Sequence, residues 1–234
     1  MRPFDLVIFD LDGTLVDSAP DIVTALNVTL AGAGRPALPF EVVMEFVGDG
    51  AAKLIERALD AGAQADGPAP DADAVLKHFL SYYADHACDA SRLYPGMLEL
   101  LDGLRDAGTT MAVLTNKVHA LARQVLDGLS VLDRFSAVVG DGAGFPRKPD
   151  TRAAHHLMAQ AAVPPERTII VGDGIPDMRL AAAVPCAGLA AGWGYVPASR
   201  LLAENPRFLA DSPAQAATIL LPSVAVGRGT ASKR

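Results

Sequence analysis

Two aspartates stand at the end of the first apolar run of the sequence. Residues 6–9 read Leu-Val-Ile-Phe and lead directly to Asp10 and Asp12. An apolar run without alternation is typical of a strand buried on both faces of a parallel sheet, and ligands bind at the carboxyl ends of such strands. Gly13 then allows a tight turn. We therefore predict that Asp10 and Asp12 face one small site, although two aspartates could also merely solubilise a loop between a strand and a helix.

Three more polar clusters follow later stretches with strand character. These clusters are Thr115 with Asn116, Lys148, and Asp173 with Asp177. Because the carboxyl ends of parallel strands lie along one edge of a sheet, we expect all four clusters to meet there. Carboxylates brought together repel one another unless a cation joins them, and oxygen ligands with room for water suit Mg²⁺ better than zinc. A carboxylate nucleophile, a metal ion, a lysine and hydroxyl and N–H donors together suit phosphoryl transfer.

The order of the elements behind these clusters predicts an α/β fold, a doubly wound parallel sheet with an inserted α-helical domain. Helical periodicity covers residues 18–30, 39–47, 51–61 and 71–86. Ser18 and Asp21 form a capping signal for the first of these helices. The Pro/Gly/Ala-rich residues 64–70 predict a surface loop within this block.

After Leu93 the pattern changes to alternating helices and strands, which is typical of a parallel sheet. The expected strands are 110–114, 135–139, 168–171, 186–190 and one near Phe208, and the expected helices include 95–107 and 118–129. The sequence therefore predicts a core domain of residues 1–16 and 91–222, a helical cap domain of residues 17–90 and a disordered tail of residues 223–234.

Composition limits the class of protein. Half of the 234 residues are apolar, 20% are charged and the mean hydropathy is +0.25, as expected of a compact soluble protein. The chain enters its first strand at once, which leaves no room for a signal peptide and predicts a cytoplasmic protein with no membrane association. Cys88 and Cys186 are interpreted as ordinary thiols. A net charge of −7 argues against nucleic acid as a partner, whereas a metal and local cations can still hold an anionic substrate.

Four motifs resemble those of the haloacid dehalogenase superfamily, in the same order. They are Asp-Leu-Asp-Gly-Thr-Leu-Val-Asp-Ser at 10–18, Leu-Thr-Asn-Lys at 114–117, Lys-Pro at 148–149 and Val-Gly-Asp-x-x-x-Asp at 171–177. The helical insert after the first motif resembles a C1-type cap. Within the superfamily, Phe-Val-Gly-Asp-Gly at 46–50, Arg-Ala-Leu at 57–59 and Leu-Tyr-Pro-Gly at 93–96 are most similar to phosphoglycolate phosphatases. The resemblance implies a small-molecule phosphate ester as the substrate and Mg²⁺ as the cofactor.

The resemblance also implies the chemical roles of three residues. Asp10 would attack phosphorus and become an aspartyl-phosphate. Asp12 would protonate the leaving alcohol and then activate water, while its backbone carbonyl binds Mg²⁺. Lys148 would neutralise charge between the nucleophile and the phosphate.

Further positions would hold the phosphate and the metal. By resemblance, Thr115 and the Asn116 backbone bind the phosphate, Asp10 and Asp173 bind Mg²⁺, and Asp177 orients Lys148 or a metal-bound water. Gly174 departs from the pattern because related phosphatases usually have serine there. We expect this difference to alter metal affinity or rate rather than to abolish activity.

Substrate selection is expected from the cap, where each candidate has a structural alternative. Residues 48–50 (Gly48, Asp49 and Gly50) could contact substrate or form only a turn between helices. Lys53 and Arg57 are spaced to share one helix face, toward a substrate carboxylate or toward solvent. Lys117 could reach substrate or be a surface lysine at the start of a helix.

Two other enzyme classes of the same superfamily remain open. A phosphomutase would move phosphate between two positions of a sugar, and a phosphonatase would need a Schiff-base lysine in the cap, for which Lys53 is the candidate. A phosphate-binding module without catalysis is disfavoured because each core catalytic position is present. Both a monomer and a homodimer are compatible with the sequence.

Overall fold

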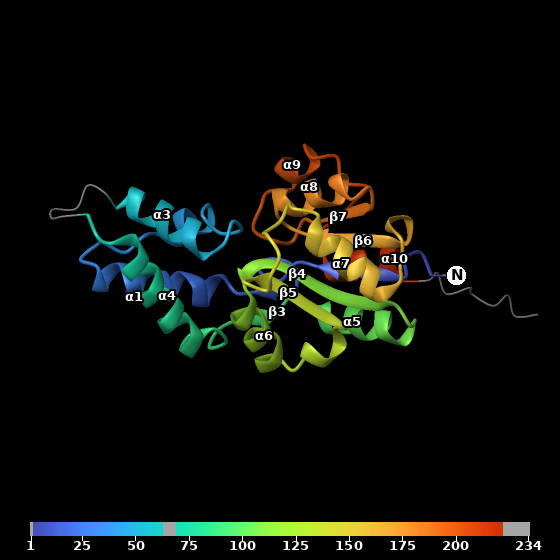
Figure 1. Cartoon of the computed structure of the whole chain (residues 1–234), viewed down its shortest axis with the longest axis horizontal. Coiled ribbons are helices and arrows are strands. Elements are labelled where there is room, and N and C mark those ends of the chain that lie inside the picture. Colours follow the sequence, from blue (N-terminus) through green and yellow to red (C-terminus); the bar gives the residue numbers. More distant parts are fainter. Residues whose placement is uncertain (1, 63–68, 222–234) are drawn as a thin grey trace, which may run out of the picture.

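A six-stranded parallel sheet forms the centre of the computed structural model, which describes residues 2–62 and 69–221 (Figure 1). The strand order is β5-β4-β1-β6-β7-β8, and each neighbouring pair is parallel. The strands are β1 (Leu6–Phe9), β4 (Thr110–Val118), β5 (Ala137–Asp141), β6 (Thr168–Gly172), β7 (Ala187–Ala191) and β8 (Phe208–Ala210). The predicted α/β fold with a parallel sheet is therefore confirmed.

Alternate side chains of β1 enter separate hydrophobic cores on the two faces of the sheet. Val7 and Phe9 belong to the core that includes side chains of α5, α6 and α10, whereas Leu6 and Ile8 pack with side chains of α7 and α8. Figure 1 shows α7 and α8 on one side of the sheet and α5 and α6 on the other. These helices span Met97–Asp106 (α5), His119–Gly128 (α6), Arg152–Ala161 (α7), Ile175–Ala183 (α8) and Pro213–Leu220 (α10), and the short α9 spans Ala198–Leu202. Burial on both faces explains why β1 is apolar throughout.

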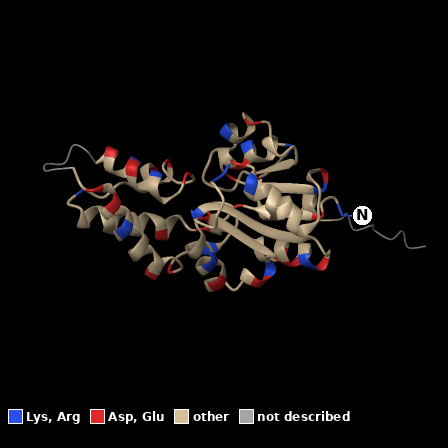
Figure 2. Cartoon of the chain, viewed as in Figure 1, with Lys and Arg blue, Asp and Glu red and all other residues tan. Residues whose placement is uncertain are grey.

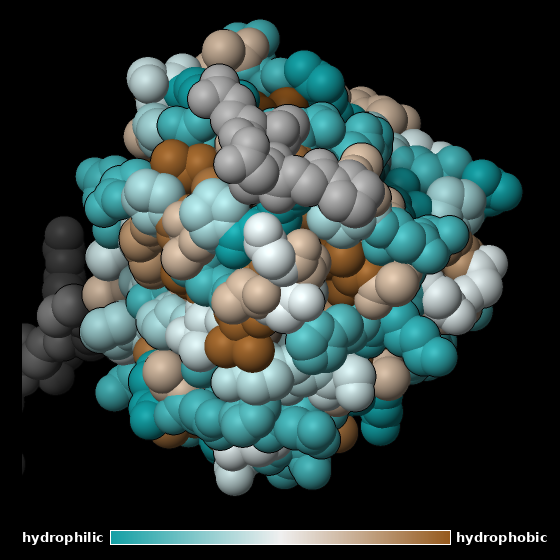
Figure 3. All heavy atoms as spheres, turned by 90° about the vertical axis from the view of Figure 1, so that its left-hand side faces the viewer, coloured by the Kyte–Doolittle hydropathy of each residue, from teal (hydrophilic) through white to brown (hydrophobic). Residues whose placement is uncertain are grey.

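Four helices form a separate layer at one end of the molecule (Figure 1). They are α1 (Ala19–Gly32), α2 (Phe40–Met44), α3 (Ala51–Ala61) and α4 (Ala72–His86). Helix α4 packs against α1 and α3, and α2 packs against α1. On the face of this end that Figure 3 shows, hydrophobic residues form separate spots within a largely hydrophilic surface. Helix α2 is shorter than the predicted 39–47, because turns replace the helix after Met44.

A two-stranded antiparallel ribbon connects the part with the six-stranded sheet to the part with helices α1 to α4. Its strands, β2 (Val16–Asp17) and β3 (Arg92–Leu93), were not predicted, because two residues are too short for a periodic signal. We propose that this ribbon marks the two crossings between core and cap, beside the predicted boundaries at 16/17 and 90/91. The predicted tail and most of the predicted loop at 64–70 lie outside the described residues.

The predicted capping interaction between Ser18 and Asp21 is wrong. Ser18 is the N-cap residue of α1, but its side chain makes no capping bond and donates instead to Asp12 Oδ1 at 2.6 Å. The buried Asp21 carboxylate accepts from the backbone N–H of Ala90 and Ser91 at 2.9 and 2.8 Å and from the Ser91 hydroxyl at 2.7 Å. Asp21 therefore fastens α1 to the chain that returns from the cap.

Asp21→Ala is expected to lower the free energy of unfolding by at least about 2 kcal/mol, because a buried donor left without a partner costs roughly 1–3 kcal/mol. Urea denaturation followed by circular dichroism measures the change. Asp133→Ala removes a carboxylate whose side chain is 85% exposed and serves as the control, with no expected change. Equal stability of the two variants would contradict the fastening role of Asp21.

Candidate active site

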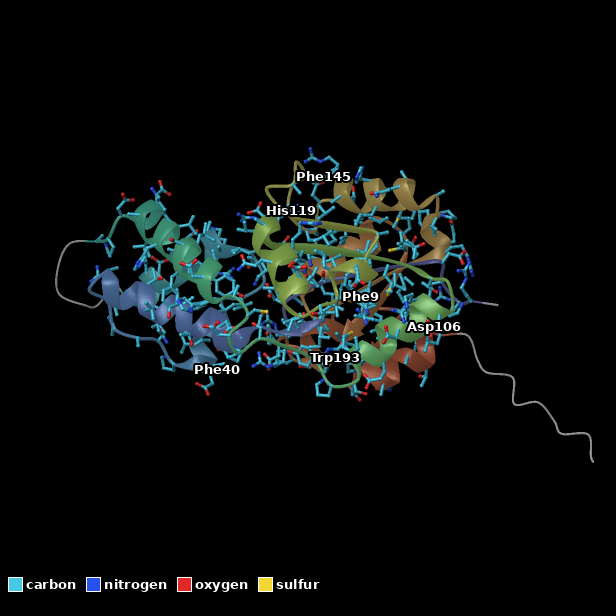
Figure 4. All side chains as sticks on the ribbon, turned by 90° about the horizontal axis from the view of Figure 1, so that it is seen from below. Phe9, Phe40, Asp106, His119, Phe145 and Trp193 are labelled. Atoms are coloured by element: carbon cyan, nitrogen blue, oxygen red, sulfur yellow. The ribbon has the colours of Figure 1, made fainter. Side chains whose placement is uncertain are left out.

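The predicted core residues meet at the carboxyl edge of the sheet. Asp10 directly follows β1, and Asp173 directly follows the neighbouring strand β6. Thr115 lies near the end of β4, on the other side of β1. Lys148 comes from the loop between β5 and α7. Figure 4 labels Phe9, the last residue of β1, which lies deep in the ribbon directly before Asp10.

Lys148 is the centre of a buried ion-pair cluster. Its side chain is 2% exposed, and its Nζ lies 2.7 Å from Asp10 Oδ1 and 2.7 Å from Asp177 Oδ1. Burial alone would lower the pKa of Lys148, but the carboxylates of Asp10 and Asp177 outweigh burial and raise it. Lys148 is therefore a fixed positive charge beside Asp10.

Asn116 fastens the loop that carries Lys148. Its Oδ1 accepts the backbone N–H of Lys148 at 2.8 Å, and its Nδ2 donates to the Lys148 carbonyl at 3.3 Å and to the Gly48 carbonyl of the cap at 3.1 Å. Thr115 is buried beside it, and its hydroxyl oxygen accepts the backbone N–H of Lys117 at 3.2 Å. The Asn116 side chain thus links the Lys148 loop to the cap. Phosphate binding, the role predicted from the sequence, would fall to its backbone.

Asp173 is enclosed by two neighbouring segments, the first motif and the loop that carries Tyr195. Its carboxylate accepts from the Thr14 hydroxyl at 2.7 Å and from the Tyr195 backbone N–H at 2.8 Å. A Cβ at Gly13 would lie 2.2 Å from Asp173 Oδ2, so this position requires glycine. Burial, together with the Asp10 charge, raises the pKa of Asp173 to about 8. A buried carboxylate of this kind favours a bound cation.

The loop that carries Trp193 and Tyr195 packs against the first motif. Trp193, labelled in Figure 4, donates its indole N–H to the Thr14 carbonyl at 3.0 Å. The Tyr195 hydroxyl accepts the backbone N–H of Ser18 at 2.8 Å. Both aromatic side chains therefore hold this loop against the first motif.

Asp12 has a partner that sequence reasoning missed. Lys117 Nζ donates to Asp12 Oδ1 and Oδ2 at 2.9 and 3.1 Å, and to the hydroxyl of Tyr83 in α4 at 2.7 Å. Strand β4 continues to Val118 rather than ending at 114, so Lys117 is a buried strand residue and not a surface lysine at a helix start. Burial acts to lower the pKa of Lys117, but Asp12 and Tyr83 raise it. The only sequence signal was the adjacency of Lys117 to Asn116.

The sequence profile of the haloacid dehalogenase-like hydrolases matches residues 7–190. This chain belongs to that family. Two curated relatives are similar over most of their length. The phosphoglycolate phosphatase of Agrobacterium fabrum is 42% identical over 200 residues, covering 84% of this chain and 85% of the relative. Phosphoglycolate phosphatase 1 of Pseudomonas aeruginosa is 37% identical over 226 residues, covering 93% and 82%.

A solved structure shares the whole architecture of this hydrolase. The crystal structure of a predicted phosphoglycolate phosphatase from Haemophilus somnus superposes with a TM-score of 0.88 at 30% identity, covering 94% of this chain and 99% of that chain. The resemblance inferred from the four motifs is therefore confirmed at the level of family and fold. None of the helices in the described ranges combines the length and the apolar character needed to span a membrane.

The residues that this hydrolase offers fit a hard cation. No group of three or more His, Cys, Asp or Glu side chains in the described chain could hold a metal ion. The predicted site needs fewer side chains, because it combines the carboxylates of Asp10 and Asp173 with the backbone carbonyl of Asp12. These donors are all oxygens, which suits Mg²⁺. Burial and the nearby Asp10 raise the pKa of Asp173, and a bound cation would stabilise the charged form of this carboxyl group. This supports the same assignment.

Gly174, where serine was expected, contributes its backbone to the site. Its N–H donates to Asp177 Oδ2 at 3.0 Å, while Asp177 Oδ1 binds Lys148. A Cβ at Gly174 would lie 2.9 Å from Asp177 Oδ2, closer than side chains normally approach. Asp177 is therefore held by Gly174 and Lys148 without a serine hydroxyl.

The cap loop at residues 48–50 rests on the core. The Asp49 carbonyl accepts from Arg147 Nη1 at 3.3 Å, in addition to the bond between Asn116 and the Gly48 carbonyl. A Cβ at Gly50 would lie 3.1 Å from the Arg147 guanidinium. The loop is thus a contact between cap and core, and its carbonyls already serve this contact.

The two basic residues of α3 each pair with an acidic side chain of the cap. Lys53 is exposed and pairs with Glu56 at 2.6 Å, so the structure does not bring it to the site. Arg57 pairs with Asp49 at 2.5 Å and lines the cleft that leads to the catalytic edge. Spacing placed the two residues on one helix, but it could not show that each has a partner within the cap.

Two hollows meet at Asp10 and Asp12. One is a cavity of about 70 Å³ between core and cap, and the other is a wide cleft of about 1200 Å³. Most residues lining the small cavity are apolar, including the cap residues Leu54, Phe79 and Leu80. The cleft reaches Lys148 and Asp173, and the cap residue Phe40 (Figure 4) lies at its border. A reacting group at Asp10 can therefore be reached through the cleft and covered by the cap.

Proposed function

We propose that this hydrolase is a Mg²⁺-dependent phosphatase that releases phosphate from 2-phosphoglycolate or a closely related small ester, through an aspartyl-phosphate on Asp10. The observation that carries the proposal is the placement of Asp10. Its two hydrogen-bonding partners in the described chain, Lys148 Nζ and the Leu11 N–H, both bind Oδ1 at 2.7 Å. Asp10 Oδ2 is left as the attacking oxygen, and Lys148 supplies positive charge beside it.

Two steps convert the ester into an alcohol and inorganic phosphate. In the first, a bond forms between Asp10 Oδ2 and phosphorus, the ester P–O bond breaks, and Asp12 gives its proton to the leaving oxygen. In the second, water attacks phosphorus, Asp12 takes a proton from that water, and the bond to Asp10 breaks. Mg²⁺, bound by Asp10, Asp173 and the Asp12 carbonyl, would polarise the phosphoryl group.

The phosphate would be held by the end of β4. Thr115 lines the small cavity together with Asp10, and its hydroxyl is available to donate because its oxygen accepts from Lys117 N–H. The Asn116 backbone N–H is assigned to a second phosphate oxygen. Asp177 also binds the Lys148 ammonium, at 2.7 Å, so it helps to keep the ammonium in place.

Local cations and the names of the curated relatives support a small, anionic substrate. The described charges of both signs are interspersed over cap and core (Figure 2), so recognition rests on the local cations and not on the general field. The two curated relatives described above carry the name phosphoglycolate phosphatase, which favours this ester among small ones.

The competing activities of the superfamily receive less support. A phosphonatase needs a Schiff-base lysine directed at the substrate, and Lys53 is exposed and paired with Glu56. A phosphomutase would return the phosphate to the same sugar. It would therefore release little inorganic phosphate.

Phosphate release from a panel of esters tests the proposal. We expect Mg²⁺-dependent release, with kcat/KM for 2-phosphoglycolate at least about tenfold above that for sugar phosphates and nucleotides. EDTA is expected to reduce the rate at least about a hundredfold, and added Mg²⁺ to restore it. Turnover that is undetectable across the panel, or insensitive to EDTA, would contradict the proposal.

A further inference from the structure

The ammonium of Lys117 is shared between the core and the cap. Its three hydrogen bonds go to the two carboxylate oxygens of Asp12, at 2.9 and 3.1 Å, and to the Tyr83 hydroxyl, at 2.7 Å. An ammonium has three N–H donors, so these bonds use its full capacity. The position of Lys117 Nζ is therefore set jointly by the first motif and by helix α4.

On the core side, Lys117 fixes the orientation of the Asp12 carboxyl group. Oδ1 accepts from both Ser18 Oγ and Lys117 Nζ, whereas Oδ2 accepts from Lys117 alone among the residues that the structure describes. A carboxylate offers about four acceptor sites, so Oδ2 keeps more capacity for a further partner. Asp12 lines both hollows of the site. Two donors thus hold Oδ1 and one holds Oδ2, so Oδ2 is the oxygen with more capacity for proton exchange.

On the cap side, Tyr83 offers Lys117 a rigid partner. Its side chain is buried in α4, and its ring stacks on Phe79 with centroids 5.6 Å apart. The Lys117 Nζ also lies 4.5 Å from the centre of the Tyr83 ring, within the range of a cation–π contact. If the cap moved away, the ammonium would exchange the fixed Tyr83 hydroxyl for water, and α4 would no longer set its position. Closure of the cap and the position of Lys117 are therefore linked.

We propose that Lys117 is a positioning residue that holds Asp12 in place for proton transfer when Tyr83 of the cap is seated on it. The proposal rests on the function proposed above. Proton transfer from Asp12 to the leaving oxygen would then be efficient only under a closed cap. An ester bound with the cap open would react slowly.

The test compares a phosphate ester and an acyl phosphate of similar size, which differ in their need for a proton. The leaving group of ethyl phosphate is an alkoxide, which needs a proton from the acid. The leaving group of acetyl phosphate is a stable carboxylate, which does not need one. The ratio kcat/KM reports only the steps up to release of the leaving group. We expect Lys117→Met to lower kcat/KM about a hundredfold for ethyl phosphate and for 2-phosphoglycolate, and less than about fivefold for acetyl phosphate.

Tyr83→Phe removes only the hydroxyl that the ammonium contacts. We expect about a tenfold loss for the two alkyl esters and little change for acetyl phosphate. Tyr82→Phe is the matched control, because it removes a hydroxyl from the adjacent position of α4, where the ring stacks on His86. This control should behave as the unchanged enzyme.

Two results would overturn the positioning role. Equal losses for all three substrates would show that Lys117 serves only the structure, and a loss confined to 2-phosphoglycolate would show that it binds the substrate carboxylate. Failure of the unchanged enzyme to hydrolyse any of the three would instead refute the proposed function.

Discussion

Asp10→Asn is expected to abolish phosphate release, with a fall in kcat of about 10⁵-fold or more. The substitution keeps the size of the side chain but replaces the attacking carboxylate by an amide, which is a very poor nucleophile. Lys148 would lose one of its two anionic partners, although an amide oxygen could still accept its hydrogen bond. Release of inorganic phosphate from 2-phosphoglycolate with Mg²⁺ measures the effect.

Covalent labelling separates loss of the nucleophile from loss of folding. With ³²P-labelled substrate and rapid acid quench, the unchanged enzyme should carry label on Asp10, and Asp10→Asn should carry none. Asp85→Asn, a substitution of an exposed aspartate of α4, should keep both label and turnover. More than a few per cent of the original kcat in Asp10→Asn would show that another residue attacks phosphorus.

The meeting of the candidate residues at one edge of the sheet could be predicted because it depends on local signals. Asp10 and Asp173 each end an apolar run, and the rule that parallel strands share a carboxyl edge brings such ends together without knowledge of the helices. The strand order places β4 and β6 on either side of β1, so Thr115 and Asp173 flank Asp10. Residue type, spacing and topology were sufficient for this part.

The prediction failed where a tertiary partner competed with a local one. Ser18 and Asp21 have the spacing of a capping pair, but Ser18 binds Asp12 and Asp21 binds the returning chain at Ser91. Lys117 has no local signal for burial, since Tyr83 lies 34 residues away along the chain. Helix spacing likewise placed Lys53 and Arg57 on α3 without revealing their acidic partners within the cap. Such pairings depend on how the cap lies on the core, which periodicity does not encode.

Lys148→Met is expected to lower both activity and stability. The substitution leaves the buried Asp177 without its cationic partner and removes positive charge from Asp10. Removing one member of a buried ion pair costs about 3–5 kcal/mol, because the remaining charge stays away from water. Urea denaturation at pH 8 measures this loss. Lys53→Met breaks the exposed pair with Glu56 and should have no measurable effect.

The stability deficit of Lys148→Met should shrink as the pH falls. Burial raises the pKa of Asp177 in the folded protein, and Lys148 opposes this effect, so its removal raises the pKa further. A carboxyl group whose folded pKa exceeds its unfolded value of about 3.9 destabilises the fold increasingly as the pH rises above that value. The deficit should therefore be largest at pH 8 and smaller near pH 5, where folded Asp177 is protonated.

The double variant Lys148→Met/Asp177→Asn removes the titrating group, so it should recover part of the stability at pH 8 and lose the pH dependence of the deficit. A deficit that stays constant from pH 5 to 8 would show that Lys148 stabilises the fold by packing rather than by its charge.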